Sequence, residues 1–283
     1  MPWSERPLTE RFGVELSGLV IGPDLPQADR MAIYDSVVEH GVAVVTGQDL
    51  SDDDFFDFAS SIGAVTPSPV MSGVPQSRVL PIGNVDAEGR LLPRDNWSVK
   101  QNQANELWHI DLTFMKPRAT ISMLYGRRCP PSGGNTEFCD LRLAYEALSP
   151  EEQLRFDPLT TSHSIIHSRR VYGLDEFTEE DRRRFPPTER PLVARHEKNG
   201  RKALLLASHI ETVSGYGSEE GAALIRDLTE RATVPRNVYS HRWTAGDFLL
   251  WDNRSVMHRA TPYDHASEPR EMKALRLYDT ADV

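Results

Sequence analysis

The second half of the chain is a series of short β-rich runs, and this pattern restricts the possible folds more than any other feature. Runs that favour strands occupy residues 107–114, 119–126, 201–208, 237–243, 247–253 and 271–280. Turn-forming residues separate them, as in PPSGGN (130–135) and TAGD (244–247). Many short strands connected in this way are typical of a barrel or a jelly roll. A core of this kind with added helices fills 283 residues, so we expect one domain over residues 1–283.

Helical patterns lie mainly before and between these strands. Residues 29–41 have apolar side chains at helical spacing, and Gly41 is the expected end of that helix. A strand is expected at 42–47, followed by a helix from residue 52 that Ser51 caps. Two helical insertions are expected around 141–157 and 218–232. The stretch 66–105 is rich in Pro, Gly, Asn and Ser, which predicts a long, partly ordered loop.

Charge and composition exclude several classes of partner. A formal net charge of −10 argues against nucleic acid and anionic membranes, which require basic surfaces. No apolar run approaches the roughly 18 residues of a membrane span, and the N-terminal residues do not have the pattern of a signal peptide. The two cysteines, Cys129 and Cys139, are not in CxxC spacing and suit a reducing cytosol. We therefore expect a cytoplasmic protein that acts on a small molecule.

The stretch ELWHIDLTF (106–114) contains the first candidate site residues. His109 and Asp111 are two residues apart, so on a strand both side chains point to the same face. A single His-x-Asp pair is common by chance, and a hydrogen-bonded pair in the core is the alternative interpretation.

A third candidate ligand follows the stretch WDNR near the end of the chain. His258 completes a set of two histidines and one carboxylate, the facial triad that selects non-haem Fe(II) and leaves three positions open. Structural zinc would require four closed ligands, often cysteines. Arg270, twelve residues later, has a planar guanidinium that could bind a carboxylate with two hydrogen bonds. On its own, Arg270 fits an ordinary surface position better than a binding role.

Several longer motifs accompany these residues in a recognisable order. They are VAVVTGQDLSDDDFFDFASSIGAV, NQANELWHIDLTF, PPSGGNTEFCDLRLAYEALSP, HSRRVYG, HRWTAGDFLLWDNRSVMHR and PREM. Over roughly residues 10 to 280 the sequence resembles the Fe(II)/2-oxoglutarate-dependent dioxygenases of the taurine and 2,4-dichlorophenoxyacetate dioxygenase group. The segment that begins at PPSGGN is most similar to the chlorophenoxyacetate branch.

This resemblance implies a mainly β protein with a double-stranded β-helix (jelly-roll) core and flanking helices. It implies that Fe(II) is bound by His109, Asp111 and His258, and that these are the catalytic residues. It places the distal carboxylate of 2-oxoglutarate on Arg270 and Thr136. It also puts His209 near the active site as a candidate substrate contact, with a position in the core or behind the residues that contact the ligands as the alternative. Members of the family are often dimeric or tetrameric, so the resemblance also implies a homo-oligomer.

The reaction that the resemblance implies consumes 2-oxoglutarate and dioxygen and releases succinate and carbon dioxide. The substrate receives a hydroxyl group. On an aryloxyacetate, hydroxylation of the methylene beside the ether oxygen gives a hemiacetal that collapses to a phenol and glyoxylate. The protein would mainly position the reactants in a dry pocket.

One departure from the family pattern concerns the substrate. The family's second arginine, four residues after the 2-oxoglutarate arginine, is Ala274 here, and Arg276 lies two residues further on. The period of a strand puts Arg270, Ala274 and Arg276 on one face and Lys273 on the other. A lysine expected between residues 65 and 78 is also missing. We therefore expect a substrate that differs from chlorophenoxyacetate or is placed differently, with Arg276 as a candidate for its anionic group.

Other activities remain open. The same centre could act on a sulfonate, an amino-acid-like compound or another small acid, or catalyse desaturation, and a non-catalytic binding barrel is a further alternative. Halogenation is disfavoured because Asp111 is present, whereas halogenases of this superfamily replace that carboxylate by a small residue. The remaining histidines are expected to be structural or exposed: His40, His163, His167, His196, His241 and His265.

Overall fold

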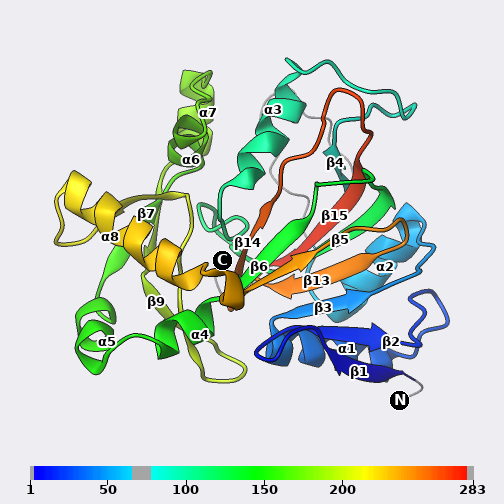
Figure 1. Ribbon diagram of the computed structural model, residues 1–283, viewed down its shortest axis with the longest axis horizontal. Coiled ribbons are helices and arrows are strands. Elements are labelled where there is room, and N and C mark those ends of the chain that lie inside the picture. The colour runs from blue at the N-terminus through cyan, green and yellow to red at the C-terminus, as the bar shows by residue number, and fades with distance from the viewer. Residues whose placement is uncertain (1–2, 66–77, 279–283) are drawn as a thin grey trace.

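A computed structural model describes residues 3–65 and 78–278 of the chain (Figure 1). Its largest element is a seven-stranded sheet in the order β1-β2-β3-β13-β5-β15-β4. The strands are β1 (Ser4–Pro7), β2 (Val14–Ser17), β3 (Val42–Val45), β4 (Leu80–Gly83), β5 (Ala119–Arg128), β13 (Phe248–Asp252) and β15 (Glu271–Tyr278). Neighbouring strands are antiparallel except β2 and β3, which are parallel.

Two helices, α1 (Gln27–His40) and α2 (Asp52–Ile62), cover one face of this sheet. Helix α1 ends at Gly41, whose φ of 80° requires a residue without a side chain. Ser51 caps α2 by accepting a hydrogen bond from the backbone N–H of Asp54. The predicted helices at 29–41 and after Ser51 are therefore confirmed, as is the strand that follows Gly41.

A second sheet of three strands lies against the opposite face. It consists of β12 (Val238–His241), β6 (Thr136–Asp140) and β14 (Val256–Ala260), with β6 in the middle. Between the two sheets, the fully buried Phe138 packs edge-to-face on Trp251 at 5.5 Å between ring centroids. Burial of a side chain of this size contributes about 2 kcal/mol. Two facing antiparallel sheets of this kind form the predicted jelly-roll core.

A separate group of short elements lies between β6 and β12 and occupies the left side of Figure 1. It contains α4 (Leu141–Glu146), α5 (Pro150–Phe156), β7 (Thr160–His163), α6 (Ile165–Val171), α7 (Glu179–Arg184), β8 (Thr188–Pro191), β9 (Val193–Arg195), β10 (Lys202–Leu204), β11 (Ile210–Val213), α8 (Ser218–Ala232) and η2 (Pro235–Asn237). The helix expected at 141–157 is thus divided in two at residues 147–149. The helix expected at 218–232 is confirmed.

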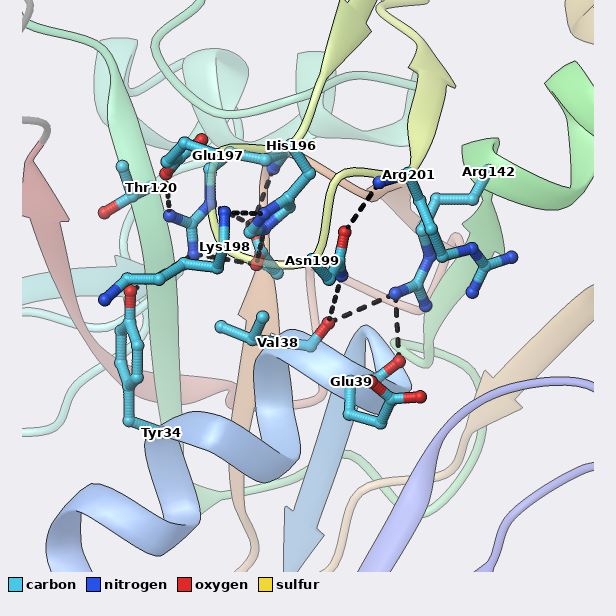
Figure 2. Close-up of polar contacts among 12 residues, drawn as sticks. Tyr34, Val38, Glu39, Thr120, Arg142, His196, Glu197, Lys198, Asn199 and Arg201 are labelled. Carbon is cyan, nitrogen blue, oxygen red and sulfur yellow. Dashed lines mark hydrogen bonds and ion pairs between the residues drawn. The ribbon is translucent and has the colours of Figure 1, made fainter.

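The loop between β9 and β10 joins this group to α1 and β13, as Figure 2 shows. His196 Nε2 lies 2.9 Å from Asp252 Oδ2, and Arg254 donates to both oxygens of the same carboxylate at 2.8 Å. Asn199 donates to the carbonyl oxygen of Val38 near the end of α1. Asp252, Arg254 and His196 are buried, so these bonds are shielded from water.

Two sequence-based predictions are wrong in part. The strand expected at 107–114 is reduced to a single bridge between His109 and His258, because a turn begins at Asp111 and Leu112 has a φ of 54°. The stretch 66–105 contains β4, helix α3 (Trp97–Gln103) and the start of the short 3-10 helix η1 (Ala104–Glu106) rather than only loop, while residues 66–77 lie outside the described part.

In the described ranges, no helix is both long and apolar enough to cross a membrane.

Candidate active site

Backbone hydrogen bonds bring His109 and His258 together at the middle of β14. The N–H of each residue donates to the carbonyl oxygen of the other at 2.9 Å. Asp111 follows in the turn after His109, and the ligand atoms of the three side chains lie within 4.8 Å of one another. All three residues are buried, with 6–7% of their surface exposed. Residues separated by about 150 positions thus form one compact group.

The histidine rings have nitrogen lone pairs available to a metal. His109 Nδ1 lies 2.8 Å from the carbonyl oxygen of Leu107, which can only accept, so Nδ1 carries the proton. Its Nε2 is then unprotonated, so the nitrogen lone pair is free, and this atom lies 3.8 Å from Asp111 Oδ1. His258 Nε2 lies 3.9 Å from Asp111 Oδ2. Burial lowers the pKa of His109 and lowers the pKa of His258 to about 3, which keeps both rings neutral.

The Asp111 carboxylate is held by neighbours on β5 and β15. Ser122 donates to its Oδ2 at 2.6 Å, and Asn253 in turn donates to Ser122 Oγ at 2.8 Å. Arg276 Nε lies 3.1 Å from Oδ2. Burial acts to raise the pKa of Asp111, but Arg276 and the two histidines outweigh it and hold that pKa well below its ordinary value. Asp111 is therefore ionised.

This donor set fits Fe(II). Two neutral imidazoles and one ionised carboxylate are the ligands of the non-haem iron triad, and no cysteine lies in the group. Structural zinc sites are closed by four ligands, whereas these three residues leave part of the coordination sphere open.

A cavity beside the triad contains the residues expected to bind 2-oxoglutarate. Arg270 is buried, and its Nε has no hydrogen-bond partner among the described residues. Thr136 lines the same cavity, and its hydroxyl oxygen accepts a bond from Trp243 Nε1 at 2.9 Å. The hydroxyl proton of Thr136 is therefore available to an acceptor in the cavity. One cation and one hydroxyl donor suit a carboxylate group.

A second cavity of about 170 Å³ adjoins the triad on another side. Its apolar walls are Leu80, Ile82, Leu112, Phe114, Ile165 and Phe185. His209 lies on this wall, where its ring packs edge-to-face on Phe114 at 4.8 Å. The hydroxyl of Ser168 donates to Ile165, so it must accept from His209 Nδ1, and His209 Nε2 is left as an acceptor. A cavity of about 150 Å³ with apolar walls holds a benzene ring, so this one is large enough for an aromatic group.

The two cavities are built from different parts of the fold. Many residues of the Arg270 cavity come from the strands β5, β6, β13, β14 and β15. Of the described residues that line the second cavity, Arg276 alone comes from those strands. The other walls come from β4, from α3 and the turn after it, and from α6 and nearby loops.

The structure brings all the predicted site residues to these two cavities. Arg270, directly before β15, lines the same cavity as Ala274 and Arg276 within the strand, and Lys273 points away toward Asp52 at 3.6 Å, as the strand period predicts. Arg276 reaches both cavities but pairs with Asp111, so its contact with substrate stays a prediction.

Three residues at the site were missed from the sequence. Ser122 is a small polar residue between Ile121 and Met123 in the buried part of β5, which is a usable signal for a polar contact. Asn253 lies in the WDNR stretch, and Arg169 in HSRRVYG, two motifs that the resemblance includes without giving these residues a role. Spacing along the chain does not reveal which face such residues occupy.

Comparison with known proteins identifies the family. The chain belongs to the taurine catabolism dioxygenase TauD, TfdA family, whose model matches residues 4–278. It is therefore a 2-oxoglutarate-dependent dioxygenase, with Fe(II) as its metal and 2-oxoglutarate and dioxygen as co-substrates.

Individual relatives support the chlorophenoxyacetate branch. The chain is 36% identical over 282 residues to the alpha-ketoglutarate-dependent 2,4-dichlorophenoxyacetate dioxygenase of Cupriavidus pinatubonensis, with 98% of each chain covered. It is 30% identical over 266 residues to the (S)-phenoxypropionate/alpha-ketoglutarate-dioxygenase of Sphingobium herbicidovorans, covering 91% of this chain and 89% of that one. The crystal structure of AAD-2 in complex with Mn(II) and N-oxalylglycine matches with a TM-score of 0.91 and 34% identity, over 99% of this chain and 98% of that one.

Proposed function

We propose that this dioxygenase hydroxylates a small organic anion with a ring-sized apolar body, of the aryloxyalkanoate class. The observation that carries the proposal is the position of the triad between two cavities of different character. One has an arginine and a hydroxyl donor, and the other has walls of leucine, isoleucine and phenylalanine. The relatives named for 2,4-dichlorophenoxyacetate and phenoxypropionate support the same class.

We assign roles to the residues as follows. His109, Asp111 and His258 bind Fe(II), and Arg270 with Thr136 binds the distal carboxylate of 2-oxoglutarate. The apolar cavity positions the carbon to be hydroxylated and keeps bulk water away from it. When bound, Fe(II) activates dioxygen and couples the decarboxylation of 2-oxoglutarate to hydroxylation of the substrate.

The reaction balances for an aryloxyacetate. One oxygen atom of O2 enters succinate and the other replaces a C–H bond of the methylene beside the ether oxygen with C–OH. The resulting hemiacetal breaks its bond between carbon and the ether oxygen, and the hydroxyl proton moves to that oxygen. The products are a phenol, glyoxylate, succinate and carbon dioxide.

The metal site is tested without oxygen. Fe(II) and 2-oxoglutarate added to the anaerobic protein are expected to give the visible metal-to-ligand charge-transfer band of the chelate. His109→Ala should abolish this band, while His40→Ala, at a partly exposed histidine beside Glu5, should leave it unchanged. Absence of the band in the wild type, or its persistence in His109→Ala, would refute the assignment of the triad.

The substrate class is tested with a panel of aryloxyalkanoates, sulfonates and small aliphatic acids. Succinate formed above the level without substrate is the readout. An aryloxyalkanoate is expected to stimulate turnover and to yield a phenol. If another class stimulates turnover and no aryloxyalkanoate does, the proposed substrate class is wrong while the metal and co-substrate roles stand.

A further inference from the structure

The apolar cavity contains one arginine that has no carboxylate partner among the described residues. Arg276 pairs with Asp111, whereas Arg169 donates from Nε to Gln101 Oε1 at 2.8 Å and from Nη2 to Asn105 Oδ1 at 3.3 Å. Both partners are neutral amides. Arg169 is largely enclosed, and burial lowers its pKa to about 10, which still leaves it charged at neutral pH. A partly buried cation without a counter-ion is costly unless an anion joins it.

A second donor lies next to Arg169. The guanidinium can only donate, so it fixes the Gln101 amide with Oε1 toward Arg169 and Nε2 away from it. Gln101 is 7% exposed, lines the same cavity, and its Nε2 has no hydrogen-bond partner in the described part of the chain. Buried amide groups are nearly always paired, so this donor also lacks an acceptor.

The cavity therefore combines an apolar wall with a cation that lacks a carboxylate partner and an amide donor that lacks an acceptor. Arg169 is close enough to the triad for its charge to act on His109 and on Asp111. The other cation without a carboxylate partner near the triad in the described ranges is Arg270, in the cavity assigned to 2-oxoglutarate. Two organic anions must bind in this reaction, and the site offers one such arginine for each.

We propose that Arg169, with the Gln101 amide as a second donor, binds the anionic group of the organic substrate. This inference rests on the proposed function, because it takes the apolar cavity as the substrate site. It places the substrate's charge on α3 and α6 rather than on β15, where the family resemblance leads us to expect a second arginine and this chain has Ala274. The substrate is then an acid whose ring packs against Phe114 and Phe185.

The test measures binding without turnover. Mn(II) and the 2-oxoglutarate analogue N-oxalylglycine are bound first, and calorimetry then gives the affinities of phenoxyacetate and of its neutral counterpart 2-phenoxyacetamide. Arg169→Leu is expected to weaken phenoxyacetate about 30-fold or more and to change 2-phenoxyacetamide less than about threefold. Gln101→Leu should weaken phenoxyacetate about fivefold, and Arg169→Lys should recover part of the loss.

Arg170→Leu is the matched control. Arg170 is the next residue of α6, but it is exposed and pairs with Asp175 at 2.6 Å on the surface. This variant should bind phenoxyacetate like the wild type. Thermal unfolding of each variant shows whether the fold is kept, and Gln101→Leu tests the proposal independently if Arg169→Leu does not fold.

The outcomes separate two kinds of failure. If Mn(II) and N-oxalylglycine do not bind, the proposed function is overturned and this inference with it. If they bind but the wild type does not bind phenoxyacetate, the proposed substrate class is overturned and the Arg169 assignment with it, while the metal and co-substrate roles stand. If the wild type binds phenoxyacetate, the Arg169 assignment alone is overturned when Arg169→Leu leaves that affinity unchanged or weakens the acid and the amide equally.

Discussion

The contacts of Asp111 show how single residues orient the candidate metal site. Ser122 on β5 gives its hydroxyl proton to one carboxylate oxygen, and Asn253 orients Ser122 by donating to it. Arg276 on β15 adds a positive charge to the same group. The carboxylate is thus held by two side chains, one of them oriented in turn by Asn253, before any metal arrives, which lowers the entropy lost when it becomes a ligand.

Ser122→Ala is expected to weaken metal binding about 10- to 100-fold, because the carboxylate loses the donor that orients it. A titration of the apoprotein with Mn(II) would measure this change. Ser4→Ala, at an exposed serine of β1, is the control and should bind the metal like the wild type. Equal affinities for Ser122→Ala and wild type would show that Arg276 alone is sufficient to hold Asp111.

Among the elements, β4 and β15 together set the position of Arg270. Gly83 at the end of β4 pairs with Glu271 and has a φ of 151°. A Cβ atom at Gly83 would lie 1.9 Å from the carbonyl oxygen of Arg270. Asn84 then bonds both backbone groups of Arg270, accepting from its N–H at 2.7 Å and donating to its carbonyl oxygen at 3.1 Å. The arginine is therefore positioned by the strand next to its own.

Gly83→Ala is expected to raise the KM for 2-oxoglutarate about tenfold or more, because the backbone of Arg270 must move to admit the methyl group. Steady-state kinetics at varied 2-oxoglutarate would show this. Gly215→Ala is a matched control, since Gly215 also has a positive φ, of 77°, but no atom lies within 4 Å of its added Cβ. A normal KM in Gly83→Ala would contradict the proposed positioning of Arg270.

The sequence predicted helices and strands well where apolar residues recur at regular spacing. It predicted them poorly where a single tertiary contact sets the backbone conformation. The strands of the sheet core and the helices α1, α2 and α8 followed from their apolar patterns. The stretch 107–114 has the composition of a strand, but within residues 3–65 and 78–278 it has one bridge partner, His258, and the turn at Asp111 redirects the chain. The metal ligands could be recognised from their residue types. The roles of Ser122 and Arg169 depend on contacts with elements far away in the sequence, which no local sequence pattern reveals.

At the scale of the whole molecule, the carboxylate of Asp252 links the jelly roll to the α4–α8 group through His196 and Arg254. Burial acts to raise the pKa of Asp252, but His196 and Arg254 lower it to about 2. The carboxylate is thus ionised in the folded protein across the neutral range.

Asp252→Asn is expected to lower the free energy of unfolding by about 3 kcal/mol, because it leaves the buried Arg254 without its main counter-charge. Urea unfolding would measure the loss. Glu146→Gln removes an exposed ion pair with Arg201 and should cost less than about 1 kcal/mol. A similar loss of unfolding free energy in both variants would mean that the contacts of Asp252 with His196 and Arg254 contribute little to stability.

Acid sensitivity is expected from the buried His163, which contacts Thr113 and Thr161. Burial lowers its pKa to about 3, so below about pH 6.5 the unfolded chain binds a proton that the folded protein does not. Stability then falls as pH decreases, by about 1.4 kcal/mol per pH unit for this group. His163→Gln should reduce the loss between pH 6.5 and pH 5 by about 2 kcal/mol in urea unfolding. An unchanged dependence of stability on pH in His163→Gln would show that His163 is not the source of the acid sensitivity.

The separate origin of the two cavity walls has a consequence for how such enzymes diversify. The triad and the 2-oxoglutarate arginine lie on the barrel strands and on the residues directly beside them, while short helices and loops supply most of the surface that faces the organic substrate. Mutations in those helices and loops can change which compound is accepted without disturbing the oxidising centre. Selection can therefore act on substrate range and on oxygen chemistry as two nearly independent traits of one chain.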